Sequence, residues 1–185
     1  MDDLQAVRRI KEGDWSGLEV LMERYQVRAV RAAFLILHDE SAAQDVVQDT
    51  FIRICRRIHQ FNEEHAFEPY FFGSVIHAAL NATRGNHKFV SLDEKSEEIE
   101  HLLDCAVSAE SQVEFLQFQH EILTALSELS PRQRAAIVQR YYLEMSEKEM
   151  AFAMQAAPGT IKWLLNAARD RLRRLLGPKG ESNDG

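Results

Sequence analysis

The stretch Leu129–Leu176, LSPRQRAAIVQRYYLEMSEKEMAFAMQAAPGTIKWLLNAARDRLRRLL, decides how the chain is organised. Ser130 followed by proline is typical of a helix N-cap with a first-turn proline. Ser146 with Glu149 predicts a capping box and a second helix, and Pro158 suits the first turn of a third. Apolar residues recur at helical spacing in all three segments. Two short helices followed, after a tight break, by a basic final helix predict a helix-turn-helix. In that motif the second helix enters the DNA major groove.

Residues 1–84 show apolar stripes at helical spacing and no useful β-alternation. Breaks are expected at Gly13 and around residues 39–41. Asp14 is a candidate N-cap after the first break, and Ser41 is a candidate N-cap after the second. The fold prediction is therefore all-α, with two small helical domains joined by a linker.

The chain has 185 residues, of which 45% are hydrophobic, and a net charge of −7. The charges are distributed unevenly, and their distribution divides the chain into the same parts. Residues 85–114 carry 2 basic and 8 acidic side chains, whereas residues 115–185 carry 10 basic and 8 acidic ones. We therefore predict a first domain at 1–84, an acidic interdomain linker at 85–114 and a second domain at 115–185. The linker composition is typical of a solvated tether.

No segment has the length and apolarity of a membrane span, and the N-terminus lacks the order of a signal peptide. Cys55 and Cys105 show no metal-ligand spacing, which indicates reduced thiols in a cytoplasmic protein, although a redox link between them stays open. The sequence has no catalytic motif, and its seven histidines show no metal-binding pattern. These features predict a binding protein without cofactor or metal, rather than an enzyme.

The C-terminal stretch resembles the promoter-reading domain of bacterial sigma factors of the extracytoplasmic-function (ECF) group, in the sigma-70 family. The residues that carry this resemblance are Leu129, Pro131, Arg132, Gln133, Arg134, Arg140, Tyr141, Tyr142, Ser146, Glu149, Met150, Ala151, Gly159, Thr160, Ile161 and Lys162. A second set of matches, in the family's order, covers the first domain. These residues are Gly13, Asp14, Trp15, Leu18, Leu21, Arg24, Tyr25, Asp39, Ala43, Asp45, Gln48, Asp49, Thr50, Phe51 and Arg53.

The resemblance implies that the first domain binds core RNA polymerase and the minus-ten promoter element. Polymerase binding is implied for Asp45, Gln48, Asp49 and Arg53, although a solvated helix face would look the same. The resemblance also implies that the linker threads a basic channel of the polymerase, where carboxylates mimic a phosphate backbone.

The resemblance further implies two promoter-DNA surfaces. Minus-ten melting is implied for Asn62, His65, His77, Asn81 and Arg84, and DNA contact in the second domain for Arg132, Lys148, Thr160, Lys162, Trp163, Asn166 and Arg169. The sequence departs from the family at Gly73, Ile76, Leu164 and Ala167, where relatives carry basic or small polar residues. Glu63, Glu64 and Glu68 add negative charge, which would weaken phosphate binding. An exposed Trp163–Leu164 pair would contact either thymine methyls or a protein.

The sequence thus predicts an alternative sigma factor that directs core polymerase to specific promoters and, as the family implies, is held by an anti-sigma factor. One rival is a sigma mimic that sequesters the anti-sigma factor without supporting transcription, which the departures at 73, 76, 164 and 167 favour. Another is a dimeric helix-turn-helix repressor, which the first-domain motifs disfavour.

Overall fold

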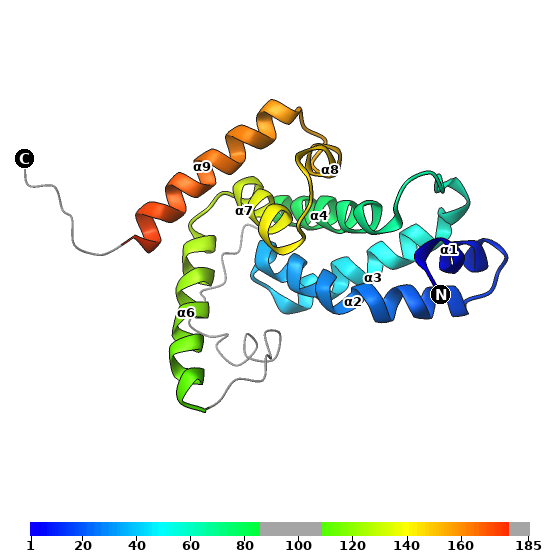
Figure 1. Cartoon of the computed structure of the whole chain (residues 1–185), viewed down its shortest axis with the longest axis horizontal. Coiled ribbons are helices and arrows are strands. Elements are labelled where there is room, and N and C mark those ends of the chain that lie inside the picture. The colour runs from blue at the N-terminus through cyan, green and yellow to red at the C-terminus, as the bar shows by residue number, and fades with distance from the viewer. Residues whose placement is uncertain (86–108, 178–185) are drawn as a thin grey trace, which may run out of the picture.

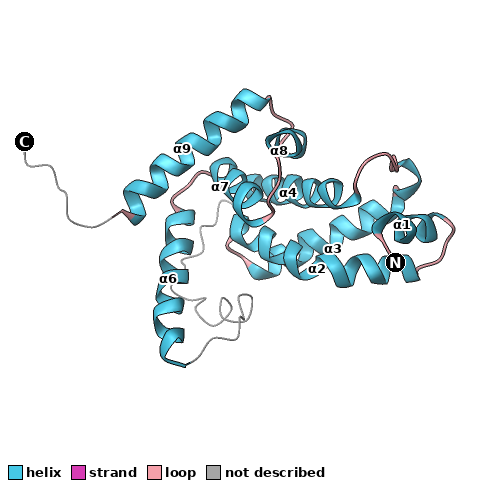
Figure 2. Ribbon diagram, in the orientation of Figure 1, coloured by secondary structure: helices cyan, strands magenta, loops and turns pink. Residues whose placement is uncertain are grey.

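The computed structural model describes residues 1–85 and 109–177, and this part of the chain is helical with no strand (Figures 1 and 2). The predicted all-α fold is confirmed. The elements of the first part are α1 (Asp3–Lys11), α2 (Ser16–Leu37), α3 (Glu40–Arg56), the 3₁₀ turn η1 (Ile58–Gln60) and α4 (Phe67–Gly85). Those of the second part are α6 (Ala109–Ser127), α7 (Pro131–Ile137), the π-helical turn η3 (Val138–Tyr142), α8 (Glu147–Ala153) and α9 (Pro158–Leu176).

The capping signals of the second part are confirmed. Ser130 accepts the N–H of Gln133 at 3.3 Å, and the Gln133 side chain accepts the N–H of Ser130 at 3.1 Å. Ser146 and Glu149 form the same reciprocal pair at the start of α8. Pro158 lies in the first turn of α9, as predicted. These caps satisfy backbone donors that have no partner inside the helix, and so fix where each short helix begins.

Two predicted caps of the first part are wrong. Helix α3 is capped by Asp39, whose carboxylate accepts the N–H of Ala42 at 3.0 Å, so that Ser41 lies inside the helix. Helix α2 begins at Ser16, and Asp14 accepts the Ser16 N–H at 3.0 Å from one position too early to be its cap. The turn before it needs Gly13, whose φ of +85° is a conformation that L side chains rarely adopt.

Aromatic side chains fill the core of the first part. The ring of Phe71 lies 4.6 Å from Phe51 on α3 and 5.6 Å from Tyr25 on α2, measured between centroids. Phe67 and Phe72 extend the cluster along α4. Offset and tilted pairs of this kind add to the free energy gained by burying the rings. The Tyr25 hydroxyl also donates to Asp3, which ties α1 to α2.

Aliphatic and methionine side chains form the core of the second part. Met150 of α8 and Ile161 of α9 are fully buried, and Leu123 of α6 and Leu165 of α9 are nearly so. Helix α6 begins at Ala109, inside the range 85–114 predicted as linker, and residues 86–108 of that range lie outside the described residues. Within the described residues, no helix has the length and apolarity that crossing a membrane requires.

Candidate functional site

Helix α3 separates its motif residues into a buried half and an exposed half. Thr50 is fully buried and donates to the Val46 carbonyl at 2.7 Å, and Phe51 is 5% exposed in the aromatic core. Asp45, Gln48 and Asp49 all lie on the exposed side, as does Arg53, which donates to the Thr50 hydroxyl at 3.1 Å. The four predicted polymerase-binding residues thus share one helix and are all exposed. Neither Asp45 nor Asp49 has an ion-pair partner within the described part of the chain.

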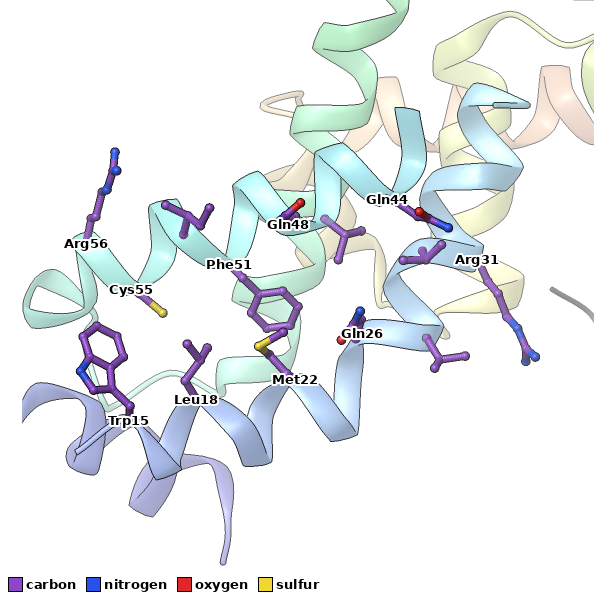
Figure 3. Close-up of a pocket in the computed structure, with 14 residues that line it drawn as sticks. Trp15, Leu18, Met22, Gln26, Arg31, Gln44, Gln48, Phe51, Cys55 and Arg56 are labelled. Atoms are coloured by element: carbon purple, nitrogen blue, oxygen red, sulfur yellow. The ribbon is translucent and has the colours of Figure 1, made fainter. Parts of the chain in front are cut away.

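An apolar groove of about 930 Å³ runs between α2 and α3, directly beside this polar face (Figure 3). Leu18 and Met22 of α2 face Phe51 and Cys55 of α3 across it. Its margin includes Trp15, Val27 and Ile52, large apolar side chains that are 61%, 60% and 44% exposed.

The groove and the polar face form one continuous surface, because Gln48 belongs to both. Arg31 and Arg56 stand at opposite ends of the groove in Figure 3. Burial raises the pKa of the Cys55 thiol, which keeps it protonated at neutral pH. The apolar floor with polar flanks matches the two faces of an amphipathic helix. The sequence does not predict this groove, because the exposure of Val27 and Ile52 becomes apparent only in the folded chain.

The loop of residues 62–65 is ordered by its own side chains. The Asn62 side chain accepts the Glu64 N–H at 3.0 Å and donates to the Glu64 carboxylate at 3.2 Å. Glu63 is paired with Lys11 and Arg8 of α1, both at 2.8 Å, and these hydrogen bonds lower the pKa of its carboxyl. Asn62 and His65 remain exposed.

The third acidic residue near this loop is also compensated. Glu68 forms an ion pair with Arg28 at 2.5 Å, and the Arg28 guanidinium lies 4.9 Å from the centre of the Phe72 ring. Two of the three acids that the sequence counts against DNA binding are therefore neutralised by neighbours. Their effect on a DNA phosphate is correspondingly smaller than their number implies.

Helix α4 carries the other predicted minus-ten residues, His77, Asn81 and Arg84. His77 is half-buried, with its Nδ1 3.4 Å from the Asn81 side-chain nitrogen, while Asn81 and Arg84 are exposed. Gly73 lies one turn before His77 and packs against Ala153 of α8, and Ile76 is fully buried. The structure therefore gives a packing reason for the absence of a basic residue at 76, where a charged side chain would lie in the core, while Gly73 lies at the contact with α8.

Helices α8 and α9 present the second group of predicted DNA residues. Thr160, Lys162, Trp163 and Asn166 are exposed on α9, and Trp163 is 64% exposed. Lys148 is exposed in the first turn of α8. The expected exposure of Leu164 is wrong. It is 4% exposed because it completes the buried stripe of α9 with Ile161, Leu165 and Ala168.

Two cations of α9 lie close to side chains of neighbouring elements. Lys162 lies 3.9 Å from Glu147 of α8. Arg169, which is half-buried, donates from Nε to the Tyr141 hydroxyl at 2.8 Å, and its guanidinium lies 5.7 Å from the centre of the Tyr141 ring. Tyr141 thus positions Arg169, a role that the sequence does not predict although Tyr141 belongs to a matching motif. Arg132 is exposed in the first turn of α7, and in the described part of the chain its side chain makes no hydrogen bond or ion pair with these residues.

Comparisons with known proteins agree with this arrangement. Residues 21–89 match the family described as Sigma-70 region 2, and residues 119–172 match Sigma-70, region 4. The RNA polymerase sigma-H factor of Pseudomonas aeruginosa is 26% identical over 182 residues, which cover 95% of this chain and 94% of that protein. The ECF RNA polymerase sigma factor SigM of Bacillus subtilis is 28% identical over 160 residues, which cover 85% of this chain and 94% of that protein.

Solved structures share the fold. CnrH, in its complex with the cytosolic domain of CnrY, superposes with a TM-score of 0.69 at 21% identity, covering 96% of this chain and 99% of that one. The sigma factor RpoE of Bartonella quintana, in complex with the anti-sigma factor NepR, superposes with a TM-score of 0.60 at 22% identity, covering 88% of this chain and 97% of that one.

Proposed function

Since the chain belongs to the ECF group of the sigma-70 family, we propose that it binds core RNA polymerase through α3 and directs it to specific promoters through α4 and α9. The observation that carries this proposal is the exposed set on α3, where Asp45, Gln48 and Asp49 lie beside an apolar groove. The protein acts as a transcription initiation factor in the cytoplasm, where the polymerase is.

The α3 surface suits a helical protein partner with a basic edge. The groove takes the partner's apolar side chains, and Asp45 and Asp49 take its cations. Because the two carboxylates have no internal ion-pair partner in the described part, pairing with polymerase breaks no existing salt bridge.

Promoter DNA is bound by two surfaces. The loop with Asn62 and His65, and the α4 residues His77, Asn81 and Arg84, hold the separated strand of the minus-ten element by polar contacts. Lys162 and Arg169 contact phosphates or base edges of the minus-thirty-five element. Trp163 supplies an apolar contact to a thymine methyl group. Thr160, Asn166, Lys148 and Arg132 add polar contacts to the same region.

An anti-sigma factor is the expected regulator. Two structures with this fold, CnrH and RpoE, were solved as complexes with CnrY and the anti-sigma factor NepR. As the family resemblance implies, the segment 85–114 would thread the polymerase channel, and its charge, with 2 basic against 8 acidic residues, suits that role.

The sigma-mimic alternative loses part of its support. It relied on non-basic residues at 73, 76, 164 and 167, but Gly73, Ile76 and Leu164 are buried. Ile76 and Leu164 are core positions and carry no information about DNA binding, so these two departures do not favour a decoy. Gly73, by contrast, is covered by Ala153 of α8 in the other half.

The affinity of the purified chain for core RNA polymerase tests the proposal. Reversing two charges, Asp45→Lys with Asp49→Lys, should weaken binding roughly 10- to 100-fold, which corresponds to about 1.4–2.8 kcal/mol. Glu12→Lys with Glu121→Lys changes net charge equally at two exposed sites away from α3 and should bind as the wild type does. Equal affinity of both double variants, with normal helical content, would contradict the α3 assignment.

A further inference from the structure

The loop of residues 62–66, which carries Asn62 and His65, is anchored at both ends in the aromatic core. Phe61, which precedes it, is 7% exposed, and its ring lies 5.0 Å from that of Tyr70, measured between centroids. Phe67, the first residue of α4, follows the loop and lies 5.7 Å from Phe61 by the same measure. The packing of these rings fixes where the loop begins and ends, but it leaves the path of the residues between them to other contacts.

Helix α1 lies beside this loop (Figure 1) and supplies those contacts. Lys11 of α1 donates from Nζ to the carbonyl of Phe61 at 3.1 Å and to one carboxylate oxygen of Glu63 at 2.8 Å. Arg8, about one turn earlier in α1, donates from Nε to the other oxygen of the same carboxylate at 2.8 Å. Cations of α1 therefore bind both oxygens of Glu63, and Lys11 also holds the backbone of the loop.

The contacts of Lys11 are the stronger part of this arrangement. The side chains of Lys11 and Glu63 are 20% and 30% exposed, whereas that of Arg8 is 61% exposed. Ion pairs that are partly shielded from water are screened less than exposed ones. We therefore expect Lys11 to hold the loop and Arg8 to add a smaller contribution.

Helix α1 is itself fixed to α2. Ala6 is fully buried, and α1 approaches α2 so closely that a Cβ atom built on Gly17 would lie 2.2 Å from the Ala6 carbonyl oxygen. The hydroxyl of Tyr25 on α2 donates to Asp3 of α1. Helix α1 lies outside residues 21–89, the range that matches Sigma-70 region 2, so its role must be inferred from its contacts. Because it is anchored on α2, it can serve as a rigid support for the loop.

With Glu63 bound to α1, the polar residues that the loop exposes are Asn62, Glu64 and His65. Asn62 accepts the Glu64 N–H with its side chain at 3.0 Å and the His65 N–H with its carbonyl at 3.1 Å. These bonds order the exposed part of the loop, while α1 fixes its position. A loop that is ordered before binding loses less conformational entropy when it takes up a base of the separated strand.

We propose that Lys11, supported by Arg8, positions the loop of residues 62–66 through Glu63 and the Phe61 carbonyl, so that the loop is ordered before it meets the minus-ten strand. Lys11 and Arg8 are positioning residues in this assignment and do not themselves touch DNA. Glu63 is then a tether and not a source of repulsion toward phosphates. The inference rests on the proposed promoter-directed function, because it explains how the minus-ten loop is prepared for its ligand.

The order of the loop in the free chain tests the positioning role without DNA. Backbone ¹⁵N order parameters of residues 62–66 should be about 0.85, the value of rigid backbone, and should fall to about 0.6 or below in Lys11→Met. Lys11→Arg, which keeps the charge and the donor groups, should retain most of this order. Unchanged order parameters in a folded Lys11→Met protein would overturn the inference.

Charge removal at two adjacent positions separates positioning from direct DNA contact. The probe is a single-stranded DNA oligonucleotide that the holoenzyme, made from core polymerase and the full chain, selects from a random pool. Glu63→Gln loosens the hold of Lys11 and should weaken binding of this probe roughly 3- to 10-fold, although it removes a negative charge. Glu64→Gln is the matched control, because it removes the same charge, leaves the contacts with α1 intact and should bind at least as tightly as the wild type.

The sign of the Glu63→Gln effect decides between the two roles. If Lys11 and Arg8 bound phosphates directly, their release from Glu63 would tighten binding of the probe, and that result would overturn the inference. A wild-type holoenzyme that selects no sequence from the pool would instead contradict the promoter-directed function, and the order parameters of the Lys11→Met loop would still decide whether α1 holds it in position.

Discussion

Helices α3 and α9 are built alike and differ in what they expose. Each buries one apolar face, through Phe51 in α3 and Leu165 in α9. The exposed face of α3 combines Asp45 and Asp49 with an apolar groove, whereas that of α9 combines two cations with Trp163. The net charge of −7 therefore conceals two local surfaces of different character, suited to a protein partner and to DNA respectively.

The two helices also differ in how their charges are held. Asp45 and Asp49 of α3 have no ion-pair partner in the described part, while Arg169 of α9 is held by the Tyr141 hydroxyl and Lys162 lies 3.9 Å from Glu147. Cations positioned in advance lose less side-chain freedom when they bind a phosphate.

The largest effect is expected from the buried apolar face that each of the two helices has, and Phe51 of α3 tests it. Phe51→Ala removes a ring 4.6 Å from Phe71 and should lower the free energy of unfolding by about 3–5 kcal/mol. Ile52→Ala, one residue later and 44% exposed, should cost less than about 1 kcal/mol. Denaturant unfolding measures both, and equal losses would show that α3 does not bury the face described.

The next effect concerns the cations of α9. Lys162→Ala with Arg169→Ala should weaken promoter-DNA binding roughly 10- to 100-fold and reduce the slope of log affinity against log salt by about 2. Arg174→Ala, at an exposed position near the end of the same helix, serves as the control. A salt slope unchanged by the double substitution would place the phosphate contacts elsewhere.

A smaller and more specific effect is expected from Trp163. Trp163→Ala should weaken binding to the preferred minus-thirty-five element by about 1–2 kcal/mol with little loss of stability, since the side chain is 64% exposed. Replacing thymine by uracil in the DNA removes the methyl group and should weaken wild-type binding more than that of the variant. Equal sensitivity of both proteins to uracil would refute a methyl contact.

The smallest effect concerns His38, beside the contact between the two halves. It ends α2 with φ of 53°, and its two ring nitrogens have no hydrogen-bond partner in the described part. Burial, with a smaller contribution from Arg134, lowers the pKa of His38 from 6.5 to about 3. Between these values only the unfolded chain takes up the proton, so stability is full above pH 6.5 and falls as the pH decreases.

His38→Asn isolates this contribution, because asparagine tolerates the left-handed conformation and does not titrate. Between pH 7.5 and 5.5 the wild type should lose about 1 kcal/mol more of its unfolding free energy than the variant does. Identical losses would mean that His38 is accessible to protons in the folded chain.

The sequence predicts most local features because their causes are local, although the predicted caps of α2 and α3 are off by one and two residues. The Ser130 and Ser146 capping boxes and the stripe that buries Phe51 depend on residues at most one or two helical turns apart. The four α3 residues proposed for polymerase share one face for the same reason. The expected exposure of Leu164 is wrong because it rests on family positions and not on the buried stripe that Leu164 forms with Ile161 and Leu165.

The remaining features depend on residues far apart in the chain. Tyr141 meets Arg169 across 28 positions, Gly73 meets Ala153 across a helix crossing, and Arg134 reaches Ile36. No local pattern specifies which buried glycine or arginine faces which helix. The same limit explains why Gly73 and Ile76 read as lost DNA contacts although both are packing positions.

Promoter-specific transcription by purified core polymerase tests the central claim most directly. Core enzyme is incubated with fragments of the source genome, with and without the chain, and the RNA start sites are mapped. The account predicts that the wild type produces RNA from a small set of fixed starts, that core enzyme alone does not, and that Asp45→Lys with Asp49→Lys abolishes these starts. A chain that binds core polymerase tightly yet yields no new start site would contradict it.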